Sequence, residues 1–171
     1  YVNKEKSLTY IGFVGHYSSG KSSTLNNIFE FEGTSNERLT DLNPTDKAIT
    51  LITHPDNSKS LVLMAREGGD VPVRTLFIDH PLLKNVVISD TPGSGDPHIV
   101  NEMIQDFLPI CDSIFYFISA TNPIDQADLP LLIQKAEKLP FIPIRYVITR
   151  SDEFRLNRNS ELSNYNINES S

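Results

Sequence analysis

Apolar residues gather in five short runs along the chain, separated by polar or turn-forming segments. The runs cover residues 8–14, 44–53, 85–89, 113–118 and 141–148. Their length and their content of β-branched and aromatic residues are typical of buried strands. After a turn at residues 54–57, residues 59–65 suggest the return strand of a hairpin, whereas residues 71–77 are ambiguous. The pattern therefore predicts a sheet built mainly from the five runs.

Between these runs, apolar residues recur with the three- and four-residue spacing of amphipathic helices. Helices are predicted over residues 23–29, over residues 99–108 with a start at Asp96 or Pro97, and over residues 125–139, where Pro140 ends the helix. Residues 30–43 show neither the two-residue spacing of a strand nor the spacing of a helix, and they are expected to form a mobile connection. Strands that alternate with helices predict an α/β fold around a mainly parallel sheet, whose ligands bind at the carboxyl ends of the strands.

The segment GHYSSGKS at residues 15–22 follows the first predicted strand and precedes the first predicted helix. It matches G-x-x-x-x-G-K-[ST], a pattern in which the glycines let successive backbone N–H groups point at a bound phosphate. Lys21 can then reach the outer phosphates, and the Ser22 hydroxyl can coordinate Mg²⁺. The alternative is a Gly/Ser turn before an ordinary helix. The order of strand, loop and helix favours the phosphate-binding loop.

A second motif, Asp90-Thr91-Pro92-Gly93, stands at the end of the predicted strand 85–89. Asp90 can hold Mg²⁺ through a water molecule, and the backbone N–H of Gly93 can contact a terminal phosphate. A β-turn would explain the same residues, because Asp and Gly are common in turns. The position at the end of a core strand, downstream of the phosphate loop, favours the nucleotide role.

A third motif, Thr149-Arg150-Ser151-Asp152, ends the last predicted strand and is a variant of [NT]-K-x-D. A carboxylate only accepts hydrogen bonds, so Asp152 can pair with the ring N–H and the exocyclic amine of guanine, whereas adenine has an acceptor at that ring position. Arg150 replaces the usual lysine, and its long side chain can still lie along a purine ring. The alternative is a helix N-cap at Ser151 or Asp152.

With the three motifs in this order, the chain resembles a Ras-like P-loop GTPase, which has a three-layer α/β fold with a mostly parallel sheet and one antiparallel strand. In detail it is similar to the G domain of bacterial dynamin-like proteins over residues 8–153. The dynamin-like features are the Thr-led third motif, the doubled serine Ser22-Ser23, the following Leu25-Asn26, and the long segment into Pro44-Thr45 and Thr50.

The resemblance implies GTP or GDP as the ligand and Mg²⁺ held by Ser22, Asp90 and a switch threonine, assigned to Thr50 with Thr45 as the runner-up. It implies catalysis by Lys21, Ser18 and Thr50. The nucleotide-binding residues are then Gly15, Tyr17, Ser18, Ser19, Gly20, Lys21, Ser22, Ser23, Gly93, Thr149, Arg150 and Asp152.

Two positions depart from related families. Tyr17 stands where animal dynamins carry glutamine, and Ser94 stands where the Ras class carries a water-orienting glutamine. Dynamin-like enzymes do without that glutamine and use the backbone, a monovalent cation and dimerisation across the nucleotide face. The resemblance therefore implies a nucleotide-dependent homodimer. His16 is interpreted as a solvated or packing residue in preference to a catalytic base.

Charge and cysteine content narrow the function further. The net charge of -7 across 171 residues, without a basic cluster, argues against a nucleic-acid surface. Cys111 is the one cysteine, so an intramolecular disulfide is excluded and a cytoplasmic location is favoured. Its apolar neighbours predict an inert thiol. Asp125 and Asp128 near a helix start are interpreted as capping charges in preference to paired catalytic acids.

The GTPase domain is expected to cover residues 1–153 and to be incomplete at its C-terminal end, because residues 154–171 form a polar, flexible tail without an apolar strand. Membrane association is expected only through parts of a longer parent protein, which would be peripheral. Two alternatives remain open: a guanine-nucleotide-dependent switch or scaffold without turnover, and an ATPase of the P-loop superfamily.

Overall fold

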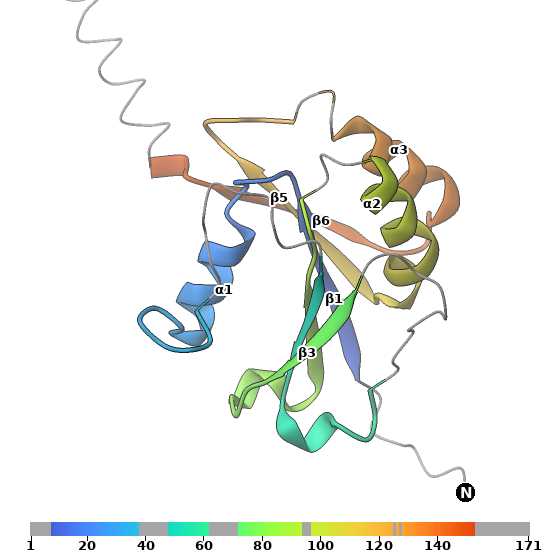
Figure 1. The fold of residues 1–171 in the computed structure, drawn as a ribbon. Helices are drawn as coiled ribbons and strands as arrows, with labels where there is room; N and C mark the ends of the chain where they lie inside the picture. The colour runs from blue at the N-terminus through green and yellow to red at the C-terminus, as the bar shows by residue number, and fades with distance from the viewer. Residues whose placement is uncertain are drawn as a thin grey trace, which may run out of the picture.

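Strands and helices alternate in the computed structural model, which describes residues 8–37, 48–61, 72–93, 97–124, 126 and 128–152 (Figure 1). The strands are β1 (Thr9–Gly15), β2 (Ile49–Thr53), β3 (Val73–Phe77), β4 (Val86–Asp90), β5 (Ser113–Ser119) and β6 (Ile144–Thr149). The α-helices are α1 (Lys21–Phe29), α2 (Pro97–Glu102) and α3 (Leu129–Lys138). Shorter helical turns are η1 (Pro55–Asn57), η2 (Pro81–Lys84), the π-helical η3 (Met103–Phe107) and η4 (Leu108–Ile110).

The six strands form one sheet in the order β3-β2-β4-β1-β5-β6. Strands β4, β1, β5 and β6 are parallel, and β2 pairs antiparallel with β4. The predicted mostly parallel sheet is confirmed. Strand β3 is parallel to β2, so two strands, and not one, run against the other four.

Helices cover both faces of the sheet, which gives three layers (Figure 1). Successive side chains of a strand point to opposite faces, and β1 shows this in its core contacts. Phe13 belongs to the same apolar cluster as Leu25 of α1, whereas Val14 belongs to the cluster that contains Met103 and Leu131 of α3. The phosphate loop leaves β1 between these two apolar layers and leads directly into α1.

Several boundaries differ from the prediction. Helix α3 begins at Leu129 and not at residue 125, because Pro130 fits the first turn of a helix, where no N–H donor is needed. Strand β6 begins at Ile144, after Pro143, which has no N–H for the ladder. The predicted helix 99–108 starts at Pro97 but passes into η3 and η4.

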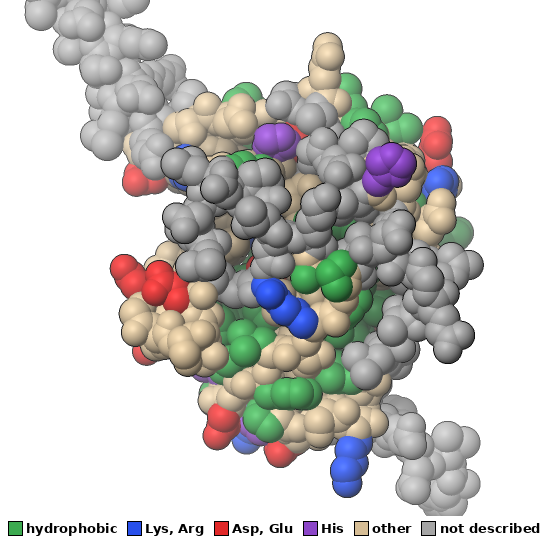
Figure 2. Space-filling model, viewed as in Figure 1, with side chains coloured by type: hydrophobic (Ala, Val, Ile, Leu, Met, Phe, Trp, Pro, Cys, Tyr) green, Lys and Arg blue, Asp and Glu red, His purple; other side chains and the backbone are tan. Residues whose placement is uncertain are grey.

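The hairpin return predicted for residues 59–65 falls mostly outside the described residues. Both edges of β2 are occupied by β3 and β4. The ambiguous stretch 71–77 supplies the neighbouring strand β3, which lies at an edge of the sheet and carries exposed apolar side chains such as Val73 and Phe77. Figure 2 shows apolar side chains at the surface of this part of the molecule.

Candidate functional site

The loop between β1 and α1 depends on backbone conformations that favour glycine. Gly20 has a φ of 88°, and a Cβ there would lie 3.0 Å from the side chain of Thr149. A Cβ on Gly15 would lie 2.5 Å from the carbonyl oxygen of Phe117. Ser18 also has a positive φ, of 62°. Because α1 begins directly after this loop, its first N–H groups and the positive end of its dipole face the loop, which favours an anion there.

Lys21 fills the centre of this loop. Its Nζ donates hydrogen bonds to the carbonyl oxygens of Gly15 at 2.8 Å and His16 at 3.0 Å, and lies 3.5 Å from Ser19 Oγ. Burial lowers the pKa of Lys21 to about 8, although the Asp90 and Asp128 carboxylates favour its charged form. The loop therefore already holds a cation at the place where a phosphate is expected.

The second motif packs directly on the phosphate loop. Thr91 Oγ1 donates to the carbonyl oxygen of Phe13 in β1 at 2.7 Å. A Cβ on Gly93 would lie 2.9 Å from the backbone nitrogen of Tyr17, so the two backbones are in close contact. Asp90 ends β4 and is buried, with 4% of its surface exposed. Ser94 lies outside the described residues.

The third motif is tied to the same loop. Thr149 Oγ1 donates to the carbonyl oxygen of Ser19 at 2.8 Å, and Gly20 packs against the Thr149 side chain. Arg150 has a φ of 52°, and the exposed Ser151 and Asp152 begin a helical turn. This geometry is compatible with a base-reading motif and with a helix N-cap. The structure thus brings the three predicted motifs together around residues 15–22.

The residues predicted to hold Mg²⁺ differ in how well their placement fits the ion. Ser22 lies in the first turn of α1, and Asp90 is close enough to Lys21 to affect its pKa. Hydroxyl and carboxylate oxygens are the hard ligands that Mg²⁺ prefers, so these two residues fit the ion. Thr50 lies inside β2 with 1% of its surface exposed, and its Oγ1 accepts a hydrogen bond from Arg74 Nε at 2.8 Å. This placement argues against Thr50 as the switch ligand, and Thr45 lies outside the described residues.

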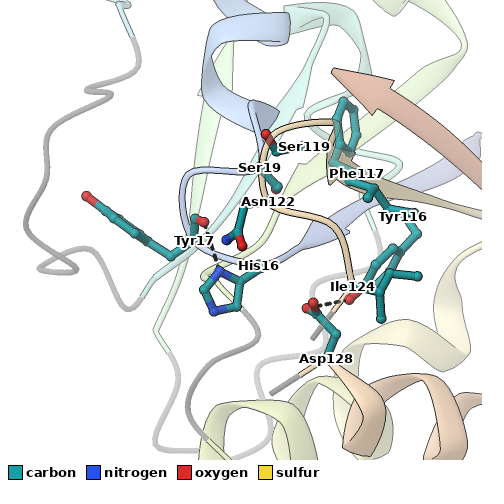
Figure 3. Close-up of a pocket in the computed structure, with 10 residues that line it drawn as sticks. His16, Tyr17, Ser19, Tyr116, Phe117, Ser119, Asn122, Ile124 and Asp128 are labelled. Atoms are coloured by element: carbon teal, nitrogen blue, oxygen red, sulfur yellow. Dashed lines mark hydrogen bonds between the residues drawn. The ribbon is translucent and has the colours of Figure 1, made fainter. Parts of the chain in front are cut away.

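A small pocket lies beside the phosphate loop, between His16 and Tyr17 of the loop and the chain that follows β5 (Figure 3). Asp128 lines it and is buried, with 4% of its surface exposed. Its carboxylate accepts a hydrogen bond from the Tyr116 hydroxyl at 2.6 Å. Asp128 occupies the N-cap position of α3, where its charge was predicted, but its side chain makes no capping hydrogen bond to the helix and binds Tyr116 instead. Its partner Tyr116 lies on a different element, β5, so no helical or strand spacing in the sequence reveals this pair.

Cys111 lies outside the site. Burial, with a smaller effect of Asp112, raises the pKa of its thiol to about 12. The thiolate is the reactive form, so the thiol is inert, as the sequence predicted.

Comparison with protein families decides which class of nucleotide-binding protein this is. The family profile described as 50S ribosome-binding GTPase (MMR_HSR1) matches residues 10–149, from the first strand to the first residue of the third motif. The chain belongs to this GTPase family. No curated protein matches the chain.

A solved structure shares the fold of this GTPase. An oligomerised bacterial dynamin pair, for which long-range sensing and tethering of membranes is described, has a TM-score of 0.53 and 18% identity over 94% of this chain. A second structure of the same description has a TM-score of 0.48 and 18% identity over 83% of the chain. The GTPase chain spans 28% and 25% of the lengths of those chains. In the part of the chain that the structure describes, no helix is long and apolar enough to cross a membrane.

Proposed function

We propose that this GTPase binds guanine nucleotides together with Mg²⁺ and hydrolyses GTP to GDP and phosphate. The observation that carries the proposal is the meeting of three motifs on one loop. Gly93 contacts Tyr17, and Thr149 donates a hydrogen bond to Ser19. A phosphate-binding loop that is joined to a γ-phosphate-sensing motif and to a base-reading motif is the arrangement that a guanine-nucleotide site requires.

Each group has a physical role in this proposal. The N–H groups of the loop and of the first turn of α1 hold the phosphates, and the Lys21 ammonium neutralises their charge. Ser22 and Asp90 hold Mg²⁺, which would supply further charge neutralisation for the terminal phosphate. Asp152 accepts hydrogen bonds from guanine. Catalysis then depends on positioning and electrostatics, with little acid or base chemistry from side chains.

Guanine selection is tested by calorimetry with GTP, GDP and ATP in the presence of Mg²⁺. Tight binding of GTP and GDP without binding of ATP is expected. Asp152→Asn should remove this preference, because an amide can also donate to an adenine acceptor. Asp56→Asn is the matched control, since Asp56 lies in η1 at the other end of the sheet and should leave the preference unchanged. Equal binding of ATP by the unsubstituted protein would support the ATPase alternative.

We further propose that the domain is dynamin-like and that self-association stimulates hydrolysis. The proposal is supported by the fold shared with a bacterial dynamin pair, which is itself oligomerised, by the loop serine Ser18, and by Ser94 in place of a water-orienting glutamine. Phosphate release per molecule should rise with protein concentration, and ultracentrifugation should detect a dimer with GTP but not with GDP. A membrane role is proposed only for a longer parent protein.

A switch or scaffold without turnover is the second candidate, and Ser94 is the observation that favours it, because no glutamine follows Gly93. This candidate predicts guanine-nucleotide binding with negligible phosphate release at every protein concentration. Rapid, concentration-dependent release would exclude it.

A further inference from the structure

Three residues form a row across the sheet next to the metal end of the site. Arg74 of β3 is in register with Thr50 of β2, and Thr50 is directly opposite Asp90 of β4. Residues that are directly opposite on paired strands project to the same face. Thr50 alternates with Ile52, which packs in the core that contains Leu25 of α1. The row therefore faces α1 and the phosphate loop.

The side chain of Arg74 is directed along this row. Its Nε donates to Thr50 Oγ1 at 2.8 Å, which holds the guanidinium beside the side chain of Thr50, the residue between Arg74 and Asp90 in the row. Opposite residues on paired strands have Cβ atoms about 5 Å apart. The positive charge of Arg74 therefore lies within about one side-chain length of the Asp90 carboxylate. Thr50 and Asp90 are both buried, whereas Arg74 is exposed on the edge strand, so water screens its charge only in part.

The other nearby cation, Lys21, is held by carbonyl oxygens of the phosphate loop and approaches Asp90 from the α1 side. Arg74 approaches from the edge strand β3, outside the three sequence motifs. The Asp90 carboxylate is thus flanked by positive charge on two sides before any metal binds. A divalent cation that enters at Asp90 meets the repulsion of both side chains.

We propose that Arg74, anchored on Thr50, is a resident counter-charge of Asp90 with which Mg²⁺ must compete. The inference rests on the proposed function, because it concerns the Mg²⁺ that accompanies the nucleotide. Arg74 is a positioning residue in this proposal and touches neither nucleotide nor metal. It sets the concentration of Mg²⁺ at which the nucleotide complex takes up its metal ion.

The test measures Mg²⁺ affinity directly, without relying on activity. A fluorescent GDP analogue is bound to the protein in EDTA, and Mg²⁺ is then titrated in. Arg74→Gln should lower the apparent Kd for Mg²⁺ about threefold to tenfold, as expected for removing a unit charge that faces a divalent ion across several ångströms. The affinity for the analogue in EDTA should change less than about twofold. Arg74→Lys keeps the charge and should behave like the unsubstituted protein.

Two further variants sharpen the result. Arg145→Gln is the matched control, because Arg145 occupies the far end of the same row, on β6, with Phe115 and Phe13 between it and Asp90. It should leave the Mg²⁺ affinity unchanged. Thr50→Val keeps a strand residue of similar shape but removes the anchor of the guanidinium, so Mg²⁺ should bind more tightly. If Thr50 were a metal ligand, the same substitution would weaken Mg²⁺ binding.

The outcomes separate the inference from the proposed function. Mg²⁺ affinity that is unchanged or weaker in Arg74→Gln, with an unaltered circular dichroism spectrum, would overturn the inference while guanine-nucleotide binding stands. Failure of the unsubstituted protein to bind the GDP analogue would overturn the proposed function itself. If Arg74→Gln loses the native circular dichroism spectrum, the Mg²⁺ titration of Thr50→Val tests the inference in its place.

Discussion

Lys21→Met removes a buried ammonium group and keeps an unbranched side chain of similar length. Burial lowers the pKa of Lys21 from 10.5 to about 8 in the folded protein. Between these two pH values the unfolded chain binds more protons than the folded one, so the free energy of unfolding rises with pH. One pKa unit corresponds to about 1.4 kcal/mol. The contribution of Lys21 to the free energy of unfolding should therefore rise by about 2.5 kcal/mol between pH 7 and pH 10.

Cys111 acts in the opposite direction over the same range. Burial raises the pKa of its thiol from 9.0 to about 12, so above pH 9 the unfolded chain loses this proton first. The free energy of unfolding should fall by about 1.4 kcal/mol at pH 10 from this group. Both proteins contain Cys111, so its effect cancels when the Lys21→Met variant is compared with the unsubstituted protein.

The comparison requires urea unfolding of both proteins at pH 7 and pH 10, in EDTA and without nucleotide. The difference in unfolding free energy between them should change by about 2.5 kcal/mol in favour of the protein with Lys21 as the pH rises. Lys138→Met, at an exposed position near the end of α3, is the control and should show no such change. The same difference at both pH values would refute the assignment of a desolvated Lys21 ammonium.

Three further predictions follow from contacts at and near the site. Tyr116→Phe removes a hydrogen bond to a buried carboxylate and should lower the free energy of unfolding in urea by about 1.5–3 kcal/mol. The control Tyr146→Phe, on the exposed edge strand, should change it by less than about 0.5 kcal/mol. Equal losses in the two variants would contradict the assigned bond. Gly93→Ala places a methyl group 2.9 Å from the backbone nitrogen of Tyr17, so calorimetry should show an affinity for GDP that is reduced about tenfold. An unchanged affinity would contradict the packing of the second motif on the phosphate loop. The thiol of Cys111 should react with a thiol reagent at pH 8 only after unfolding, and rapid labelling of the native protein would contradict its burial.

The sequence predicted those parts of the site that depend on local backbone geometry. Gly15 and Gly20 are required by the loop itself, so the motif appears as a fixed pattern between a strand and a helix. Asp90 and Thr149 were predictable because each ends an apolar run, and the ends of parallel strands lie at the same edge of the sheet.

The contacts between side chains on different elements could not be predicted. Arg74 lies on an edge strand that is partly exposed, so residues 71–77 lack the continuous apolar run of a central strand. Without the strand order, nothing in the sequence places Arg74 beside Thr50. The bond between Tyr116 and Asp128 likewise depends on how the start of α3 packs against β5, and a carboxylate near the start of a predicted helix resembles an ordinary capping charge.

The hydrogen bond from Thr149 to Ser19 joins residues 130 positions apart, and this distance has a consequence for biosynthesis. Because a chain is synthesised from its N-terminus, the phosphate-loop sequence leaves the ribosome long before β6 is available to make this stabilising contact. The entropy of closing so long a loop must be overcome before the bond can form. Nucleotide capture should therefore be a late event in folding, and GDP would select nascent chains whose last described strand has already joined the sheet.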